Sequence, residues 1–189
     1  MQGAGKAGML KDTAKPCGDD APIFLIGYRG TGKTTVAREL AARLGYRAVD
    51  SDDVVEAEAG TTIARIFAED GEGAFREFEA RAVGALSRER RVVVGLGGGA
   101  VLREENRRAI CAAGPVIWLQ AGVDTILARV TADPATADRR PNLTTGGGQA
   151  EVEVLLAKRA PLYRECATLI VDTEGKSASE VADEILRSL

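Results

Sequence analysis

The chain of 189 residues contains no histidine, few aromatic residues (4%) and only three cysteines. The lack of histidine excludes zinc sites with imidazole ligands, serine–histidine triads and a histidine general base, so that any base must be Asp or Glu. The cysteines Cys17, Cys111 and Cys166 lie far apart and are odd in number, which predicts reduced thiols rather than a disulfide framework. We therefore expect a cytoplasmic protein whose acid–base chemistry depends on carboxylates.

Long apolar runs and an excess of basic residues are also missing. No apolar stretch approaches the roughly 18 residues of a membrane span, and the N-terminal residues lack the apolar segment of a signal peptide. The net charge of −3, with scattered basic residues, argues against nucleic acid as a partner. We predict one monomeric domain over residues 21–189, preceded by a polar, glycine-rich, flexible tail over residues 1–20.

The most informative segment is GYRGTGKT at residues 27–34, which fits the phosphate-binding pattern G-x-x-x-x-G-K-[S/T]. An apolar run before it predicts a buried strand, and the periodic apolar positions after it predict a helix. A glycine loop between a strand and a helix N-terminus directs backbone N–H groups and the helix dipole at an anion. Lys33 is then expected to reach the outer phosphates, and the Thr34 hydroxyl to bind Mg²⁺.

Beyond this loop, apolar runs alternate with segments of helical periodicity, which predicts an α/β fold with a parallel sheet covered on both faces. Strands are expected at residues 22–26, 46–49, 92–96, 116–120 and 168–172. Helices are expected at residues 33–44, 52–59, 62–69, 73–90, 103–113, 123–131, 150–160 and 178–188. Ser177 and Glu180 have the spacing of a capping box for the last helix.

Residues 133–149 interrupt the alternation with a long polar stretch rich in glycine and proline. Loops of this length inside a compact domain are usually functional or disordered. Because two adjacent arginines, Arg139 and Arg140, lie within the stretch, we interpret it as a mobile lid over phosphates. A plain surface insertion is the alternative.

Two further segments follow predicted strands, where ligands of open α/β folds bind. The carboxylates of Asp50 and Asp52 share one face if the extended conformation continues, so that one can support Mg²⁺ and the other can hold a substrate hydroxyl. Helix capping by Asp52 is the alternative. The glycines at residues 97–99 end another strand and allow a small ligand to approach the backbone closely.

Two arginines carry weaker local signals. Arg76 lies in a predicted amphipathic helix, three residues before Glu79, so that one side chain can orient the other. Arg159 precedes Pro161, which we expect to end the helix and leave Arg159 in its last turn. Basic residues in a last turn are ordinary partners of the helix dipole.

Taken in order, these features resemble those of the shikimate kinases. The motifs are the P-loop at residues 27–34, D-S-D at 50–52, F-R-x-x-E at 75–79, G-G-G at 97–99, R-P at 140–141 and R-A-P-L-Y at 159–163. A P-loop alone is shared by many families, but this ordered combination is much more specific. The resemblance extends from about residue 22 to about residue 188.

The resemblance implies a transferase: a kinase that uses ATP to phosphorylate the 3-hydroxyl of shikimate, giving shikimate 3-phosphate and ADP, on the route to chorismate and the aromatic amino acids. It implies a P-loop kinase fold like that of the nucleoside monophosphate kinases. That fold has a five-stranded parallel sheet, substrate-binding helices at about residues 52–90 and a mobile lid. The implied cofactor is Mg²⁺, and the implied partners are ATP and shikimate.

The resemblance also assigns site residues, motif by motif. The implied ATP-binding residues are Gly30, Thr31, Gly32, Lys33, Thr34, Thr35, Arg129 and Arg140. The implied shikimate-binding residues are Asp52, Arg76, Gly98, Gly99 and Arg159, with the arginines on the carboxylate. The implied catalytic residues are Lys33, Asp52 (as the base) and Arg140, and the implied metal-binding residues are Thr34 and Asp50. Either Arg139 or Arg140 can be the lid arginine.

Two other functions remain open from the sequence. A gluconate or nucleoside monophosphate kinase would share the P-loop, although the few aromatic residues disfavour stacking of a nucleotide acceptor. A nucleotide-binding switch or a non-catalytic subunit is the other alternative. Residues 70–73, DGEG, fit a GTPase pattern formally, but no N-K-x-D guanine motif is present.

Overall fold

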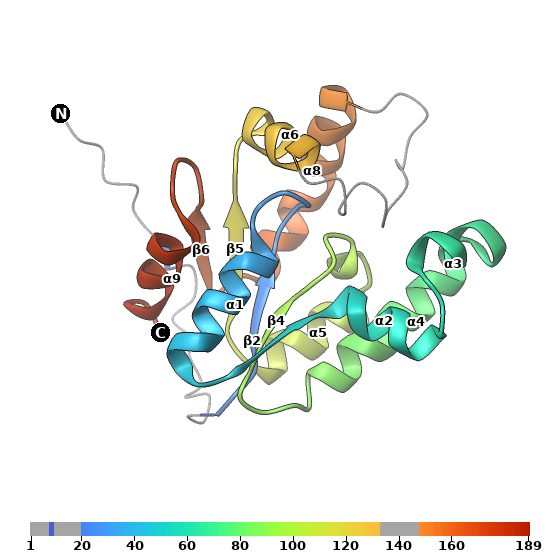
Figure 1. The fold of residues 1–189 in the computed structure, drawn as a ribbon, viewed down its shortest axis with the longest axis horizontal. Helices are drawn as coiled ribbons and strands as arrows, with labels where there is room; N and C mark the ends of the chain where they lie inside the picture. Colours follow the sequence, from blue (N-terminus) through green and yellow to red (C-terminus); the bar gives the residue numbers. More distant parts are fainter. Residues whose placement is uncertain (1–7, 10–19, 133–147) are drawn as a thin grey trace.

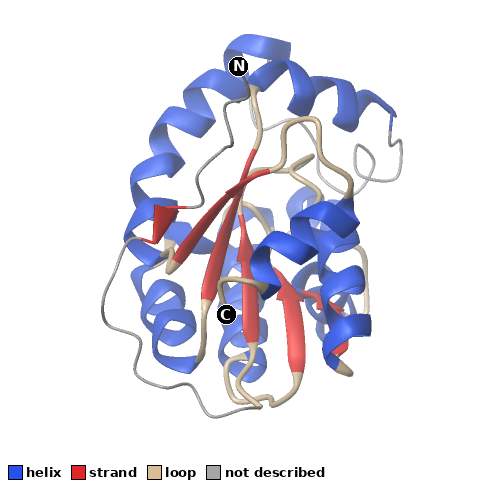
Figure 2. Cartoon of the chain, turned by 90° about the vertical axis from the view of Figure 1, so that its left-hand side faces the viewer, coloured by secondary structure: helices blue, strands red, loops and turns tan. Residues whose placement is uncertain are grey.

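A computed structural model describes residues 8–9, 20–132 and 148–189, and it contains a twisted sheet between two layers of helices (Figures 1 and 2). The parallel strands are β2 (Ile23–Ile26), β3 (Arg47–Asp50), β4 (Val92–Gly95), β5 (Val116–Gln120) and β6 (Leu169–Asp172). The sheet order is β1-β6-β5-β2-β4-β3, in which β1 (Gly8–Met9) pairs antiparallel with β6. The predicted five-stranded parallel sheet is confirmed, whereas the extra edge strand lies where a flexible tail was expected.

The helices occur in the predicted order. They are α1 (Lys33–Leu44), α2 (Ser51–Ala59), α3 (Ile63–Glu69), α4 (Gly71–Leu86), α5 (Glu104–Ala113), α6 (Val123–Ala132), α8 (Gly148–Cys166) and α9 (Ala178–Leu186), with a short 3₁₀ turn, η1, at Ala100–Leu102. The capping box at Ser177 and Glu180 is present at the start of α9. The predicted helix at 73–90 instead spans Gly71–Leu86, and its C-cap residue, Ser87, donates a hydrogen bond from its hydroxyl to the Val83 carbonyl.

Helix α8 differs most from its prediction at residues 150–160. It starts at Gly148, which takes in the last two residues of the predicted lid, and it continues through Pro161 to Cys166. Pro161 is exposed, while Tyr163 and Cys166 pack into the core, so that burial of the last turn outweighs the backbone hydrogen bond that proline cannot donate. Arg159 therefore lies inside α8 and not in its last turn.

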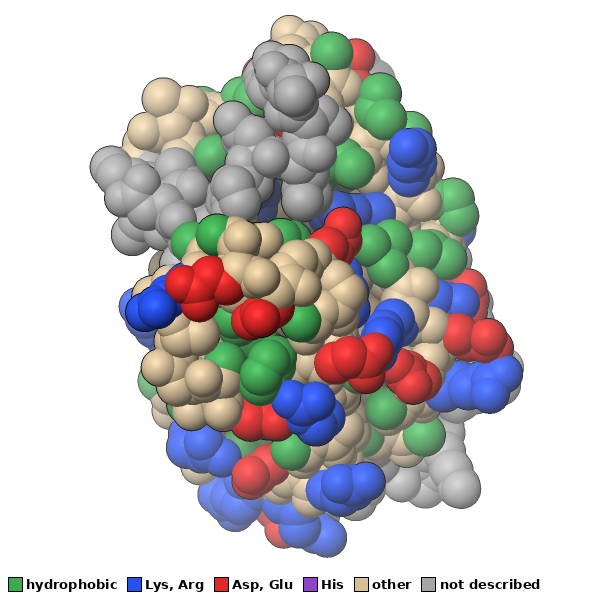
Figure 3. All heavy atoms as spheres, turned by 90° about the vertical axis from the view of Figure 1, so that its right-hand side faces the viewer, with side chains coloured by type: hydrophobic (Ala, Val, Ile, Leu, Met, Phe, Trp, Pro, Cys, Tyr) green, Lys and Arg blue, Asp and Glu red, His purple; other side chains and the backbone are tan. Residues whose placement is uncertain are grey.

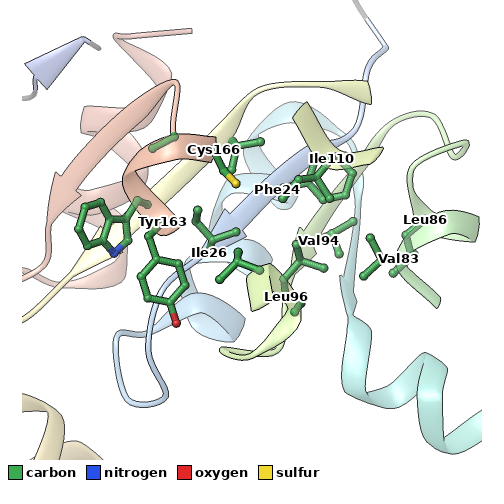
Figure 4. Close-up of a cluster of buried hydrophobic side chains, with 14 of the residues drawn as sticks. Phe24, Ile26, Val83, Leu86, Val94, Leu96, Ile110, Tyr163 and Cys166 are labelled. Carbon is green, nitrogen blue, oxygen red and sulfur yellow. The ribbon is translucent and has the colours of Figure 1, made fainter. Parts of the chain in front are cut away.

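Each face of the sheet has its own layer of helices. Alternate residues of β2 separate the layers, since Phe24 and Ile26 face α4, α5 and α8 (Figure 4), whereas Ile23 and Leu25 face α1 and α9. Strands buried on both sides account for the continuous apolar runs of the sequence. A smaller cluster around Phe75 joins α2, α3 and α4 to one another.

The strand order reverses direction at β2. The chain passes from β2 to β3 at one edge, returns to β4 beside β2, and then continues with β5 on the other side. Such a switch point, at the carboxyl ends of the strands, is where open α/β folds bind ligands.

On the face of the molecule shown in Figure 3, acidic and basic side chains are interspersed.

Candidate active site

The loop between β2 and α1 has the strained backbone of a phosphate-binding loop. Gly32, directly before α1, has a φ of 87°, a value that residues other than glycine rarely adopt. At Gly27 a Cβ atom would lie 2.4 Å from the Leu119 carbonyl oxygen, so the loop can pass over β5 only with glycine there. These contacts explain two glycines of the motif and leave the N-terminus of α1 open to an anion.

Lys33 is held over this loop by the loop's own backbone. Its Nζ donates to the carbonyl oxygens of Gly27, at 2.9 Å, and Tyr28, at 2.8 Å. The Thr31 hydroxyl also donates to the Tyr28 carbonyl, at 2.8 Å. The lysine charge is thus fixed at the N-terminus of α1, where positive potential from the helix dipole is already present.

Thr34 and Asp50 are in direct contact. The Thr34 hydroxyl donates to Asp50 Oδ2 at 2.9 Å, and the backbone N–H of Asp52 donates to Asp50 Oδ1 at 3.0 Å. Helix α2 begins immediately after Asp50, so the extended conformation does not continue to Asp52. The capping residue is Asp50, not Asp52 as the alternative interpretation supposed.

Burial raises the pKa of the Asp50 carboxyl above its ordinary value, and the nearby Asp52 charge adds to the effect. A cation beside Asp50 would oppose both effects by favouring the ionised carboxylate. The oxygen donors of Thr34 and Asp50 suit Mg²⁺, which takes its remaining ligands from water and phosphates. Within the described ranges, no group of three or more His, Cys, Asp or Glu side chains is placed to hold a metal ion.

The glycine turn after β4 is tied to the rest of the site by side chains. The buried Ser51 hydroxyl accepts a hydrogen bond from the Gly97 N–H at 2.9 Å. The Gly98 carbonyl accepts hydrogen bonds from the Tyr163 hydroxyl, at 2.6 Å, and from the Arg159 guanidinium, at 3.4 Å. The turn therefore lies between the start of α2 and the middle of α8.

Arg76 lies against the same turn from α4. A Cβ atom on Gly99 would be 2.6 Å from the Arg76 guanidinium, so glycine is required for this approach. The guanidinium bonds to Glu79, at 2.7 Å, and to Glu72, at 2.9 Å. The Glu79 side chain is only 1% exposed, and the expected orientation of Arg76 by Glu79 is confirmed.

Arg129 joins α6 to the phosphate loop. It donates to the Gly30 carbonyl at 3.4 Å, and to the hydroxyl and carbonyl of Thr173 at 3.0 Å each. Thr173 follows β6 and is itself buried. The arginine is thereby fixed at the end of the sheet, next to the loop.

These segments surround a cleft of about 760 Å³ at the carboxyl ends of the strands. The predicted residues that line it are Gly30, Thr31, Gly32, Lys33, Thr34, Thr35, Asp50, Asp52, Gly98 and Arg129. Gly99, Arg76 and Arg159 do not line it, but they lie around the Gly98 turn at one end of it. Arg139 and Arg140, with most of the predicted lid, lie outside the described residues.

Several polar residues in or around the cleft are absent from the sequence-based assignment. Ser51 lies between the two aspartates that were singled out, and Tyr163 ends the R-A-P-L-Y segment, so both had a local signal. Thr173 and Lys176 line the cleft itself. They follow the last strand without a motif, and only the pairing of β5 with β6 brings them to the site.

A phosphate loop at the switch point of a parallel sheet, with an Asp–Thr pair and a glycine turn in one cleft, defines the class of P-loop small-molecule phosphotransferases. A model of the shikimate kinase family matches residues 29–189. The chain belongs to the shikimate kinase family.

Individual relatives agree over nearly the whole length. The chain is 43% identical to shikimate kinase from Rhodopirellula baltica, over 95% of this chain and 94% of the relative. It is 46% identical to shikimate kinase from Oleidesulfovibrio alaskensis, over 88% and 96% respectively. Among solved structures, shikimate kinase from Acinetobacter baumannii in complex with shikimate superimposes with a TM-score of 0.83 and 36% identity, over 89% of this chain and 92% of that one.

Proposed function

We propose that the cleft transfers the γ-phosphoryl group of ATP to the 3-hydroxyl of shikimate, giving shikimate 3-phosphate and ADP. The observation that carries this proposal is the meeting, at one end of the sheet, of a phosphate loop, a pair of aspartates and a glycine turn flanked by two arginines. Membership of the shikimate kinase family supports the identity of the acceptor.

The donor half of the proposed site is the phosphate loop. The backbone N–H groups of residues 30–35 bind the phosphates, and Lys33 exchanges its bonds to loop carbonyls for bonds to the outer phosphates. Thr34 and Asp50 would hold Mg²⁺, which would supply positive charge against the negative charge that develops on the phosphates. Arg129, next to Gly30, borders the nucleotide.

The acceptor half is the glycine turn with its two arginines. Arg76 and Arg159 approach the turn from α4 and from α8, and a carboxylate between them would receive charge-assisted hydrogen bonds. The backbone of Gly98 and Gly99 allows a small ring to lie close to the turn. Shikimate, a small anion rich in hydroxyls, suits this chemistry.

Asp52 is the proposed base. It lines the cleft at the first turn of α2, between the phosphate loop and the glycine turn. There it can hold the acceptor hydroxyl and accept its proton as the bond to phosphorus forms. Because phosphoryl transfer has a loose transition state, positioning and charge stabilisation contribute more than base strength. Arg140, outside the described residues, stays a predicted lid arginine that meets the transferring phosphate.

The decisive experiment measures ADP release from Mg²⁺-ATP with shikimate, gluconate, AMP, CMP or no acceptor. Shikimate-dependent turnover is the expected result, and mass spectrometry should detect one added phosphate on the product. Turnover with another acceptor alone would contradict the Asp52 and arginine assignments while leaving the P-loop kinase fold intact. ATP binding without turnover on any acceptor would instead support a non-catalytic role.

The oligomeric state and the cellular location belong to the same proposal. In the described residues, no helix is both long and apolar enough to cross a bilayer. We propose a monomer that works in the cytoplasm, where ATP and reduced thiols are present. Light scattering on the purified protein measures the oligomeric state, and a dimer mass would contradict the first part.

A further inference from the structure

Tyr28 is a large aromatic residue of the phosphate loop that does not line the cleft. It is only 2% exposed, and it packs with Ile126 of α6 and Val152 of α8. Its backbone carbonyl accepts the hydrogen bonds of Thr31 and Lys33. The same residue therefore contacts the lysine of the donor half through its backbone and helix α8 through its side chain.

Two guanidinium groups lie near the Tyr28 ring. The central carbon of Arg159 is 5.6 Å from the ring centroid, and that of Arg29 is 6.0 Å away. Both distances fall within the roughly 6 Å over which an aromatic face attracts a cation, and the attraction is stronger where water is excluded. Arg159 is only 6% exposed, so this contact is largely shielded from water.

A buried carboxylate completes this group. Glu151 is 5% exposed and lies eight residues before Arg159 on α8, so both occupy one face of the helix. The charges of Arg29, Arg159 and Glu151 all act on the Tyr28 hydroxyl, whose pKa is raised chiefly by burial. Two cations against one carboxylate leave a net positive charge around the Tyr28 ring, beside the Gly98 turn where Arg159 lies.

We propose that Tyr28 is a positioning residue for the acceptor, whose ring holds the Arg159 guanidinium against the Gly98 turn. Without the ring, Arg159 would have more rotamers available, and ordering it would oppose binding of the acceptor carboxylate. The phosphate loop thereby contributes to acceptor binding as well as to ATP binding. This role rests on the proposed function, because it assigns the acceptor carboxylate to Arg159.

The test compares variants that separate the ring from its hydroxyl. Tyr28→Leu keeps an apolar side chain against Ile126 and Val152 but removes the ring, and it should raise the KM for shikimate about 3- to 30-fold. The KM for ATP and kcat should change less than about two-fold. Tyr28→Phe keeps the ring and should restore most of the wild-type KM for shikimate. Tyr28→Met is the second ring-free variant, used if Tyr28→Leu does not fold.

Val152→Ala is the matched control, because it loosens the same apolar cluster but leaves the ring and both guanidinium groups in place. It should lower the melting temperature without raising the KM for shikimate. An unchanged KM for shikimate in both ring-free variants would overturn the proposal, as would an equal rise in the KM for ATP or an equal effect of Val152→Ala. Wild-type protein that does not turn over shikimate at all would contradict the proposed function instead.

Discussion

The donor half of the cleft is built from neighbours in the sequence, whereas the acceptor half is built from three distant segments. Lys33 is fixed by carbonyls five and six residues away, within one loop. Arg76 and Arg159 come from α4 and α8 and meet only because both approach the turn after β4. A local site depends on the conformation of one loop, while an assembled site depends on the packing of the whole domain.

The two acceptor arginines differ in the same way. Arg76 is held by Glu72 and Glu79, one turn away on its own helix. Arg159 is held by partners far along the chain, the Gly98 carbonyl and the Tyr28 ring. Arg76 therefore brings its orientation with its helix, whereas the orientation of Arg159 depends on how α8 packs against the phosphate loop.

The largest effect is expected where the two halves meet, at Asp52. Asp52→Asn should lower kcat by about 10²- to 10⁴-fold, because the neutral amide holds the acceptor hydroxyl less firmly in position and cannot accept its proton. The affinity for ATP, measured by calorimetry, should stay nearly unchanged, since the phosphate loop is intact. An equal loss of ATP affinity and turnover would show that Asp52 supports the donor half instead.

Lys33→Met should have the next largest effect, confined to the donor half. Removal of a preorganised cation from the transferring phosphates should lower kcat about 10²- to 10³-fold and weaken ATP binding. Shikimate binding in the absence of nucleotide should remain close to wild type. A marked loss of that binding would mean that the two halves are not separable.

Arg76→Ala tests the acceptor half and should weaken shikimate binding rather than ATP binding. The loss of charge-assisted hydrogen bonds should weaken shikimate binding about 10- to 100-fold, with little change in the affinity for ATP. Glu79 would be left buried without its arginine, so the melting temperature should also fall. Titration calorimetry with each ligand separates these outcomes, and an unchanged shikimate affinity would remove Arg76 from the site.

Gly99→Ala should also impair shikimate binding in the acceptor half, but by less than Arg76→Ala. The new methyl group would collide with the end of the Arg76 side chain, which is flexible, so the guanidinium should shift while the fold persists. We expect the KM for shikimate to rise about 3- to 30-fold, which is less than the effect of Arg76→Ala. A wild-type KM would show that the close approach of Arg76 to the turn is not needed.

Gly84→Ala is the matched glycine variant and has the smallest expected effect. Gly84 lies inside α4, and a Cβ atom there would meet no atom within 4 Å. The substitution should stabilise the helix by about 0.5–1 kcal/mol without altering either KM. Urea unfolding measures the gain, and a loss of stability would show that α4 cannot accommodate a methyl group at this position.

The order of strands and helices, and the proposed donor half of the site, could be predicted from the sequence alone. Buried strands read as continuous apolar runs, and the phosphate loop is contiguous, so neither needs knowledge of what packs against it. The end of α8 could not be predicted from Pro161, because the burial of Tyr163 and Cys166 is a tertiary effect. The edge pairing of β1 likewise depends on where β6 lies.

The assembly of the proposed acceptor half depends on tertiary packing. Family resemblance named Arg76, Gly98, Gly99 and Arg159, but the packing of α4 and α8 around the glycine turn is what places them together. Ser51, Tyr163 and Tyr28 each lie within a motif, but their partners are 46 to 131 positions away in the sequence. Such contacts leave no periodic or contiguous pattern, because their distances are set by the packing of helices on the sheet rather than by spacing along the chain.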